Sequence, residues 1–377
     1  MRRQQKHLVL KDLEKKMVFL TGPRQVGKTW LAKEISQEFS PSVYLNYDRL
    51  EDRQIIDAEA WLASTELLIL DELHKKKGWK NFLKGVFDTK PDHMKILVTG
   101  SARLETFRQS GDSLAGRFFR HRLLPFSPAE LSSEPEGTDL QRFIKRGGFP
   151  EPFLGEHDLD ADRWRMQYID GLIRTDILDF ERIHDLKAAQ LIFELLRRRV
   201  GSPISYQSIA GDVGVSPNTV KRYIKIFESL FIVFPVRPFS RNIARSILKE
   251  PKIYFFDTGL VHGDEGAKLE NLVALCLYKY ACAVEDYQGR PCRIDYLRDK
   301  EGREVDFCLV VEEKPEQIIE VKLSESLPSK HLLYFLKKYA FPATQVVLNL
   351  KREQMQQSVS IRKAADFLKS LEGTLKN

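Results

Sequence analysis

The chain has 377 residues, of which 42% are hydrophobic and 30% charged, and its formal net charge is +7. This composition is typical of a globular protein of two or three domains and argues against a disordered chain. No apolar run approaches the roughly 20 residues that span a bilayer, and the basic N-terminal stretch lacks the apolar core of a secretory signal. We therefore expect a cytoplasmic protein without a membrane partner.

The positive charge is concentrated in the middle of the chain. Between Asp185 and Arg245 there are ten Lys or Arg and four Asp or Glu, a local excess of six positive charges. A clustered basic charge favours an anionic polymer as a partner. The four cysteines lack a C-x-x-C spacing, which argues against a zinc finger and favours buried free thiols. They are Cys276, Cys282, Cys292 and Cys308.

The first motif lies in MVFLTGPRQVGKTWLAKEI, which predicts a strand at Met17 to Leu20, a loop, and a helix from about Lys28. The loop matches G-x-x-x-x-G-K-[ST], whose glycines let backbone N–H groups wrap a phosphate at the start of a helix. Lys28 would reach the β and γ phosphates of ATP, and Thr29 would bind Mg²⁺. The expected nucleotide contacts are Gly22, Pro23, Arg24, Gln25, Val26, Gly27, Lys28, Thr29 and Trp30.

A second apolar run, in ELLILDELHK, ends at Asp71 and Glu72. In P-loop ATPases the first acid holds Mg²⁺ and a following Glu can polarise the attacking water. An ordinary strand end is the alternative interpretation, which the upstream P-loop weakens. The next apolar strand, in KILVTGSARL, ends near Ser101, which could contact the γ-phosphate or simply belong to a turn.

Several motifs together resemble a group of prokaryotic AAA-superfamily ATPases whose C-terminal half is a domain of unknown function with a restriction-endonuclease-like core. The motifs are LTGPRQVGKT, LILDELHK, VTGSARL, LAGR with LLPFSPAEL, GGFPEP and YFFDTGL. The resemblance implies an ATPase and makes Arg117, in LAGR, a candidate for completing the ATP site of a neighbour in a homo-oligomer, as arginine fingers do. An exposed surface residue is the alternative.

The middle segment predicts a helix over 187–199, a helix over Tyr206 to Asp212, a turn, and a helix capped by Ser216. The apolar run from Leu230 to Val236 would be a strand of a wing. This is the pattern of a winged helix-turn-helix, whose second helix enters the major groove of duplex DNA. The side chains expected to face DNA are Asn218, Thr219, Lys221 and Arg222. A packing or dimerisation role is the alternative.

The last third predicts the order α-β-β-β-α-β, with Glu270 on the first helix. This is the order of a restriction-endonuclease-like core, in which an acid precedes a [D/E]-x-K motif. Here Asp306 precedes Glu320 by 14 residues, and Lys322 completes the motif. Carboxylates on adjacent strands can hold Mg²⁺ or Mn²⁺ for phosphodiester hydrolysis, with Lys322 stabilising the phosphate. Solvated strand charges, or an inactive binding module, are the alternatives.

These patterns together predict an α/β protein in three parts. The parts are a P-loop AAA-type domain over 1–150, a helical connection and winged helix-turn-helix over 151–245, and a restriction-endonuclease-like domain over 246–377. The predicted function is ATP hydrolysis coupled to DNA binding, with a metal-dependent nuclease module. The alternatives are a nucleotide-dependent switch that binds DNA or a protein without cutting, and an ATPase whose winged helix is only structural.

Overall fold

The computed structural model describes residues 3–100, 114–132, 134, 139–172, 185–240 and 250–371. The chain forms two compact units, Met1–Leu124 and Pro125–Asn377. The three-part division expected from the sequence stays a prediction, and Ser101 lies outside the described residues.

Unit 1 is built on a five-stranded parallel sheet of order β2-β3-β4-β1-β5. Strands β1, β3 and β4 are almost wholly buried, as expected for continuous apolar runs in a parallel sheet covered on both faces. The strands are β1 (Met17–Thr21), β2 (Ser42–Asn46), β3 (Leu67–Asp71), β4 (Lys95–Thr99) and β5 (Phe118–Arg122). The helices are α1 (Lys6–Leu13), α2 (Lys28–Ser36), α3 (Leu50–Asp57), η1 (Leu73–Lys75) and α4 (Trp79–Thr89).

Strand order brings the two predicted nucleotide motifs together. Strand β4 lies between β1, which leads into the P-loop, and β3, which ends at Asp71. All the strands run in the same direction, so the loop after β1 and the acids after β3 meet at the carboxyl edge of the sheet. Helix α2 begins at Lys28, which confirms the predicted start.

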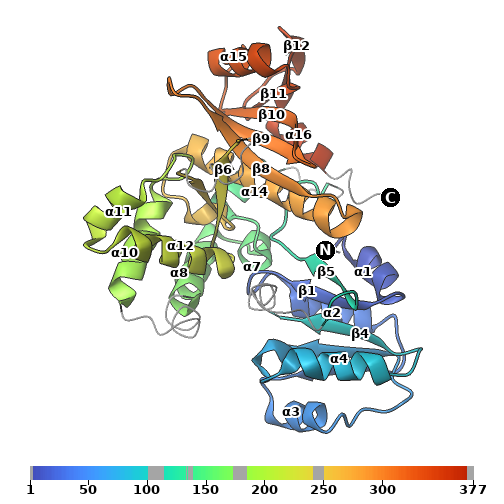
Figure 1. Cartoon of the computed structure of the whole chain (residues 1–377). Helices are drawn as coiled ribbons and strands as arrows, with labels where there is room; N and C mark the ends of the chain where they lie inside the picture. Colours follow the sequence, from blue (N-terminus) through green and yellow to red (C-terminus); the bar gives the residue numbers. More distant parts are fainter. Residues whose placement is uncertain are drawn as a thin grey trace. The chain divides into compact units, whose positions relative to one another are not determined.

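Unit 2 begins with helices and continues into a large sheet (Figure 1). The side chains of Asp185, Ser205 and Ser216 cap three consecutive helices of this unit, and the cap at Ser216 confirms the sequence prediction. The helices are α6 (Leu140–Arg146), α7 (Pro150–Leu154), α8 (Asp158–Gly171), α10 (Leu186–Arg197), α11 (Tyr206–Val213), α12 (Pro217–Ser229), η5 (Thr258–Leu260), α14 (Glu265–Gln288), α15 (Lys330–Tyr339) and α16 (Ala364–Ser370).

The sheet of unit 2 has eight strands in the order β12-β13-β11-β10-β9-β8-β6-β7. Strands β8, β9 and β10 form an antiparallel meander, and β11 pairs with β10 in parallel. The predicted order α-β-β-β-α-β is therefore present from α14 to β11. The strands are β6 (Val233–Pro238), β7 (Lys252–Phe255), β8 (Cys292–Arg298), β9 (Glu304–Val311), β10 (Lys314–Lys322), β11 (Ala343–Val347), β12 (Gln354–Gln356) and β13 (Val359–Lys363).

The strand expected at Leu230 begins three residues later, at Val233. Leu230 instead caps α12, with its N–H bonded to Ile226, and Phe231 has a φ of 55°. Strand β6 pairs with β7 in an antiparallel manner, while Arg237 and Pro238 pair with β8. The strand expected to form a wing is thus also part of the sheet that carries Asp306 and Glu320.

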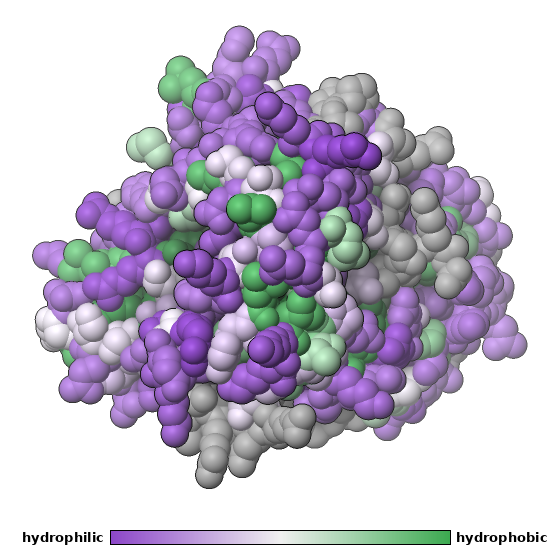
Figure 2. Space-filling model, turned by 90° about the horizontal axis from the view of Figure 1, so that it is seen from above, coloured by the Kyte–Doolittle hydropathy of each residue, from purple (hydrophilic) through white to green (hydrophobic). Residues whose placement is uncertain are grey.

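The four cysteines are buried and free, as expected. On the face shown in Figure 2, hydrophilic residues surround several separate hydrophobic patches. Among the residues that the structure describes, no helix is both long and apolar enough to cross a membrane.

Candidate functional site

The P-loop of unit 1 joins β1 to α2 through two glycines with positive φ. Gly22 has a φ of 146°, and a Cβ there would lie 2.1 Å from the carbonyl oxygen of Leu123. Gly27 has a φ of 96° and directly precedes α2. Both positions therefore require glycine, because a larger residue would be strained or would clash. The loop is held in a conformation that opens onto the N-terminus of α2.

The side chain of Lys28 folds back over this loop. Its Nζ donates to the carbonyl oxygens of Gly22, at 3.0 Å, and Pro23, at 2.6 Å. Burial lowers the pKa of Lys28 to about 8, although Glu72 and Asp71 act in the opposite direction. An ammonium group held only by two carbonyl oxygens is incompletely compensated, and an anionic phosphate would compensate it.

The Asp71 carboxylate is the centre of a hydrogen-bond network. Its Oδ2 accepts from the hydroxyl of Thr29 at 3.3 Å and from the hydroxyl of Tyr44 at 2.5 Å. Its Oδ1 accepts from the hydroxyl of Thr99. The structure thus brings together the two residues expected to bind Mg²⁺. Sequence reasoning missed Tyr44, which lies in β2, because no local motif marks it.

Glu72 follows Asp71 with a φ of 55°. Its Oε2 lies 3.4 Å from Lys75 Nζ and 3.7 Å from His74 Nε2. These contacts hold the carboxylate at the same sheet edge as Asp71, where a water-polarising residue is needed.

Arg117 lies just before β5 and forms two contacts with the Asp88 carboxylate, at 2.9 and 3.1 Å. Met17 pairs with Phe118 at the start of two parallel strands, so Arg117 lies at the sheet edge opposite the P-loop. It is therefore placed away from the ATP site of its own chain, and its role toward a neighbour stays a prediction.

The other expected nucleotide contacts differ in exposure. Pro23 and Val26 are buried. Arg24, Gln25 and Trp30 are exposed, with 51% of Trp30 accessible.

The predicted DNA-facing residues lie on α12 of unit 2. Asn218, Lys221 and Arg222 are exposed, and Thr219 is half-buried with its N–H bonded to the Ser216 hydroxyl. The opposite side of the helix is buried and comprises Val220, Tyr223, Ile224 and Phe227. In the neighbouring basic run, Arg197 contacts Glu194 and Arg199 contacts Asp212, each through an ion pair. Both arginines are therefore already paired with carboxylates of unit 2.

The register of β9 and β10 brings the predicted metal ligands together. Ile319 pairs with Phe307 in antiparallel strands, so one further step places Glu320 opposite Asp306. The Asp306 Oδ2 accepts a 2.8 Å hydrogen bond from Val321 N–H. Residues directly opposite share a face of the sheet, so both carboxylates point to the same side. Lys322 shares this face, and its Nζ lies 3.0 Å from Glu320 Oε1.

Helix α14 brings Glu270 to the same group, in which Glu304 is an additional member. We call Glu270, Glu304, Asp306 and Glu320 the carboxylate cluster. Burial and the Asp306 carboxylate raise the pKa of both Glu270 and Glu320. Glu320 is 5% exposed, and its Oε2 has no hydrogen-bond partner among the residues that the structure describes. Burial beside a like charge therefore disfavours the ionised form of these two carboxyl groups.

Sequence reasoning missed Lys252 and Tyr254 in β7. Lys252 Nζ contacts three members of the cluster, and the hydroxyl of Tyr254 donates to Glu270 at 2.6 Å. A lysine beside the apolar run IYFF was the available signal, because a charge beside a buried strand requires a partner. Among the described residues, no group of three His, Cys, Asp or Glu has the geometry to hold a metal ion.

Gly147 and Gly259, from two of the sequence motifs, lie against a buried ion pair. Arg165 Nε lies 3.0 Å from Asp257 Oδ2. A Cβ at Gly147 would lie 1.8 Å from Asp257 Oδ1, and one at Gly259 would lie 2.1 Å from the Arg165 guanidinium. The motifs GGFPEP and YFFDTGL therefore contribute to the packing of unit 2.

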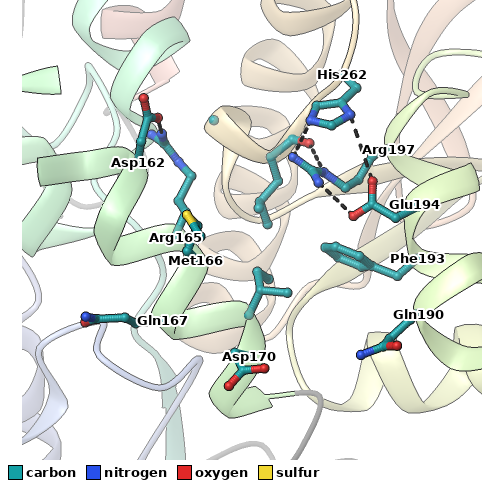
Figure 3. Close-up of a pocket in the computed structure, with 13 residues that line it drawn as sticks. Asp162, Arg165, Met166, Gln167, Asp170, Gln190, Phe193, Glu194, Arg197 and His262 are labelled. Carbon is teal, nitrogen blue, oxygen red and sulfur yellow. Dashed lines mark hydrogen bonds and ion pairs between the residues drawn. The ribbon is translucent and has the colours of Figure 1, made fainter. Parts of the chain in front are cut away.

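A pocket of about 840 Å³ lies beside this ion pair (Figure 3). It is lined by α8, α10 and the segment from Gly259 to His262. Arg197 donates to Leu260 O and to His262, and it pairs with Glu194. Burial and Arg197 lower the pKa of His262. The Arg197 guanidinium is therefore already bound within the pocket wall.

Comparison with known families gives three matches. Residues 14–132 match a family described as an AAA domain, whereas residues 137–269 and 265–365 match families described as domains of unknown function (DUF8612 and DUF4143). The AAA match covers the P-loop, Asp71, Glu72 and Arg117. It supports an AAA-type P-loop ATPase in the N-terminal part of the chain.

Related proteins include an uncharacterised protein of Mycobacterium tuberculosis, 25% identical over 65% of this chain and 55% of the relative. An uncharacterised protein of Mycobacterium bovis matches to the same extent, so this chain spans about half the length of these two curated relatives. An uncharacterised protein of Methanocaldococcus jannaschii is 24% identical over 81% of this chain and 74% of the relative.

Similar solved structures include the Walker-type ATPase PABY2304 of Pyrococcus abyssi. It is 15% identical, with a TM-score of 0.43, over 69% of this chain and 94% of that one. A variant of Thermotoga maritima RuvB is 20% identical, with a TM-score of 0.31, over 61% of this chain and 87% of that one.

Proposed function

We propose that this protein binds and hydrolyses ATP at the P-loop of unit 1. The observation that carries the proposal is the hydrogen bond from the Thr29 hydroxyl to the Asp71 carboxylate. It lies beside the P-loop, over which the Lys28 side chain folds to reach the carbonyl oxygen of Gly22. Backbone N–H groups of the loop would bind the phosphates, and Lys28 would exchange its two carbonyl partners for phosphate oxygens. Thr29 and Asp71 are the residues that would hold Mg²⁺, which neutralises phosphate charge when bound.

Glu72 would accept a proton from the attacking water, or orient it. Its contacts with Lys75 and His74 hold the carboxylate in place without burying it fully. In this proposal Lys28 contributes to ATP binding, whereas Glu72 contributes to hydrolysis.

Two variants test this division. Lys28→Ala should abolish ATP binding measured by calorimetry, whereas Glu72→Gln should bind ATP and hydrolyse it at least about a hundredfold more slowly. Lys11→Ala changes an exposed lysine of α1 and should have no effect. Tight ATP binding by the Lys28 variant would refute the assignment.

We further propose that α10, α11, α12, β6 and β7 form a winged helix-turn-helix that binds duplex DNA. The order of three helices and an antiparallel strand pair, with an additional bridge between Pro203 and Lys252, supports this proposal. The polar face of α12 carries Asn218, Lys221 and Arg222 and would lie in the major groove. A segment that only packs within unit 2 is the alternative.

The carboxylate cluster supports a second function, metal-dependent cleavage of phosphodiesters. Asp306 and Glu320 face each other, and within the described part of the chain the buried Oε2 of Glu320 has no hydrogen-bond partner. Mg²⁺ is commonly held by one or two carboxylates together with substrate phosphates, so this pair fits a divalent ion. Such an ion would supply charge neutralisation, while Lys322 would contact the phosphate and Glu270 would contribute negative charge from α14.

A plasmid-cleavage assay with Mg²⁺ or Mn²⁺, with and without ATP, tests the second function. Asp306→Asn should eliminate cleavage and leave ATP hydrolysis intact, because Asp306 and the P-loop lie in different units. If wild-type protein binds DNA but does not cut it under any of these conditions, the nucleotide-dependent switch is the better description.

A further inference from the structure

The strongest unassigned feature is the buried side chain of Lys252, at the start of β7. Its Nζ lies 2.8 Å from Glu304 Oε1, 3.3 Å from Glu270 Oε1 and 3.7 Å from Asp306 Oδ1. These carboxylates come from β9 and α14, so one ammonium group joins two elements that are distant in sequence. Lys252 thus already supplies a cation to one side of the carboxylate cluster.

The position of Lys252 is fixed by its surroundings. The residue is 1% exposed, pairs with Val236 in β6 and bridges to Pro203. Its Nζ also lies 5.5 Å from the centre of the Tyr296 ring. A buried ammonium group is stable only with such partners, and its removal would leave carboxylates uncompensated. Lys252 is therefore a fixed cation partner of the carboxylate cluster.

Asp306 lies between two environments. Its Oδ1 faces Lys252, and its Oδ2 accepts from Val321 N–H, next to Glu320. Sites with two metal ions place them roughly 3.5–4 Å apart with ligands between them. On the Glu270 and Glu304 side, that place is taken by an ammonium group. On the other side, no described residue forms a hydrogen bond with the buried Oε2 of Glu320.

We propose that Lys252 stands in for a second metal ion, so that the carboxylate cluster takes a single divalent cation at Asp306 and Glu320. This inference rests on the proposed metal-dependent function and specifies its site. Lys252 acts as a positioning residue that joins Glu270, Glu304 and Asp306 around one ammonium group and thereby limits the number of ions.

The test is a titration of the full chain with Mn²⁺ alone, followed by calorimetry and by the electron paramagnetic resonance of free Mn²⁺. An Asp71→Asn background removes binding at the P-loop. We expect one ion per chain in this background. Adding Lys252→Met should allow a second ion, or tighten the first at least about tenfold, because a repelling positive charge is lost. Two ions with Lys252 present, or an unchanged number and affinity in Lys252→Met, would overturn the inference.

A charge-balanced variant guards against misfolding. If Lys252→Met does not fold, Lys252→Met/Glu304→Gln removes one charge of each sign and should still bind a second Mn²⁺, because the place of the ammonium group is then open. The matched control is Lys279→Met, which removes a half-buried lysine that is also paired with a carboxylate, that of Glu130. It should leave Mn²⁺ binding unchanged, and an equal change in this control would count against a local effect of Lys252.

The titration also separates this inference from the proposed cleavage. One ion in the background and a second in Lys252→Met, without DNA cleavage by wild-type protein, would support the role of Lys252 and refute the nuclease function. No Mn²⁺ bound in either protein would overturn the inference.

Discussion

The hydroxyl of Tyr44 and the carboxylate of Asp71 form a 2.5 Å hydrogen bond across β2 and β3. Burial, followed by this contact, raises the pKa of Tyr44, so the phenol remains a donor at neutral pH. The same Asp71 oxygen accepts from Thr29. Tyr44 therefore orients the acid that would hold Mg²⁺.

Tyr44→Phe should raise the Mg²⁺ concentration needed for half-maximal ATP hydrolysis by about tenfold, because hydrogen bonds to charged groups contribute about 1.5–3 kcal/mol. ATP binding without Mg²⁺ should change little. ATPase assays over a range of Mg²⁺ concentrations would measure this shift. Tyr47→Phe removes the same group nearby and serves as the control. If both variants behave alike, Tyr44 has no specific role at Asp71.

The buried pair of Arg165 and Asp257 should be essential to the stability of unit 2. Arg165→Met leaves the Asp257 carboxylate buried without its partner, which should cost about 3–5 kcal/mol. Thermal unfolding would show the loss. Arg163→Met, at an exposed position of the same helix, should have a much smaller effect. Equal losses in the two variants would contradict the proposed importance of the pair.

Asp295 should make unit 2 less stable as the pH rises. Burial raises its pKa from 3.8 to about 6, against the opposing effect of Arg293. The pKa of Asp295 is higher in the folded protein than in the unfolded chain. Its contribution to the free energy of unfolding is therefore complete below about pH 3.8 and is lost as the pH rises through about 6. The side chain in Asp295→Asn cannot ionise. The free energy of unfolding of this variant, relative to wild type, should therefore rise by on the order of 2 kcal/mol between pH 4 and pH 7.

Urea unfolding at both pH values would measure the relative stability of Asp295→Asn. The exposed Asp366→Asn is the matched control and should show no comparable gain. A constant difference between Asp295→Asn and wild type across this pH range would show that the carboxylate does not titrate as inferred.

DNA binding by α12 should depend on two exposed cations. Lys221→Ala/Arg222→Ala should weaken binding to duplex DNA and reduce the slope of log affinity against log salt by up to about two, because fewer counterions are released. Fluorescence anisotropy at several salt concentrations would give the slope. The control is Lys300→Ala/Lys314→Ala, which removes two positive charges at exposed positions away from α12. Lys300 lies in the connection between β8 and β9, and Lys314 is the first residue of β10. An identical slope in wild type and the α12 variant would favour a packing role.

The sequence by itself determined the features that depend on near neighbours in the chain. The P-loop could be predicted because strand, glycine loop and helix are consecutive, and α2 does begin at Lys28. The cap at Ser216 and the buried side of α12 follow from helical spacing in the same way. The order of elements from α14 to β11 was likewise available from local patterns.

Only the tertiary structure decided which distant residues meet. Tyr44 reaches Asp71 because β2 pairs with β3, and Lys252 reaches Glu304 because β7 enters the sheet through β6. The register that sets Glu320 opposite Asp306 depends on hydrogen bonds between whole strands. A shift of one residue would turn these side chains to opposite faces, and spacing along one strand does not fix its alignment with another. The candidate metal ligands could therefore be named from the sequence, but the Lys252 ammonium group that pairs with them could not.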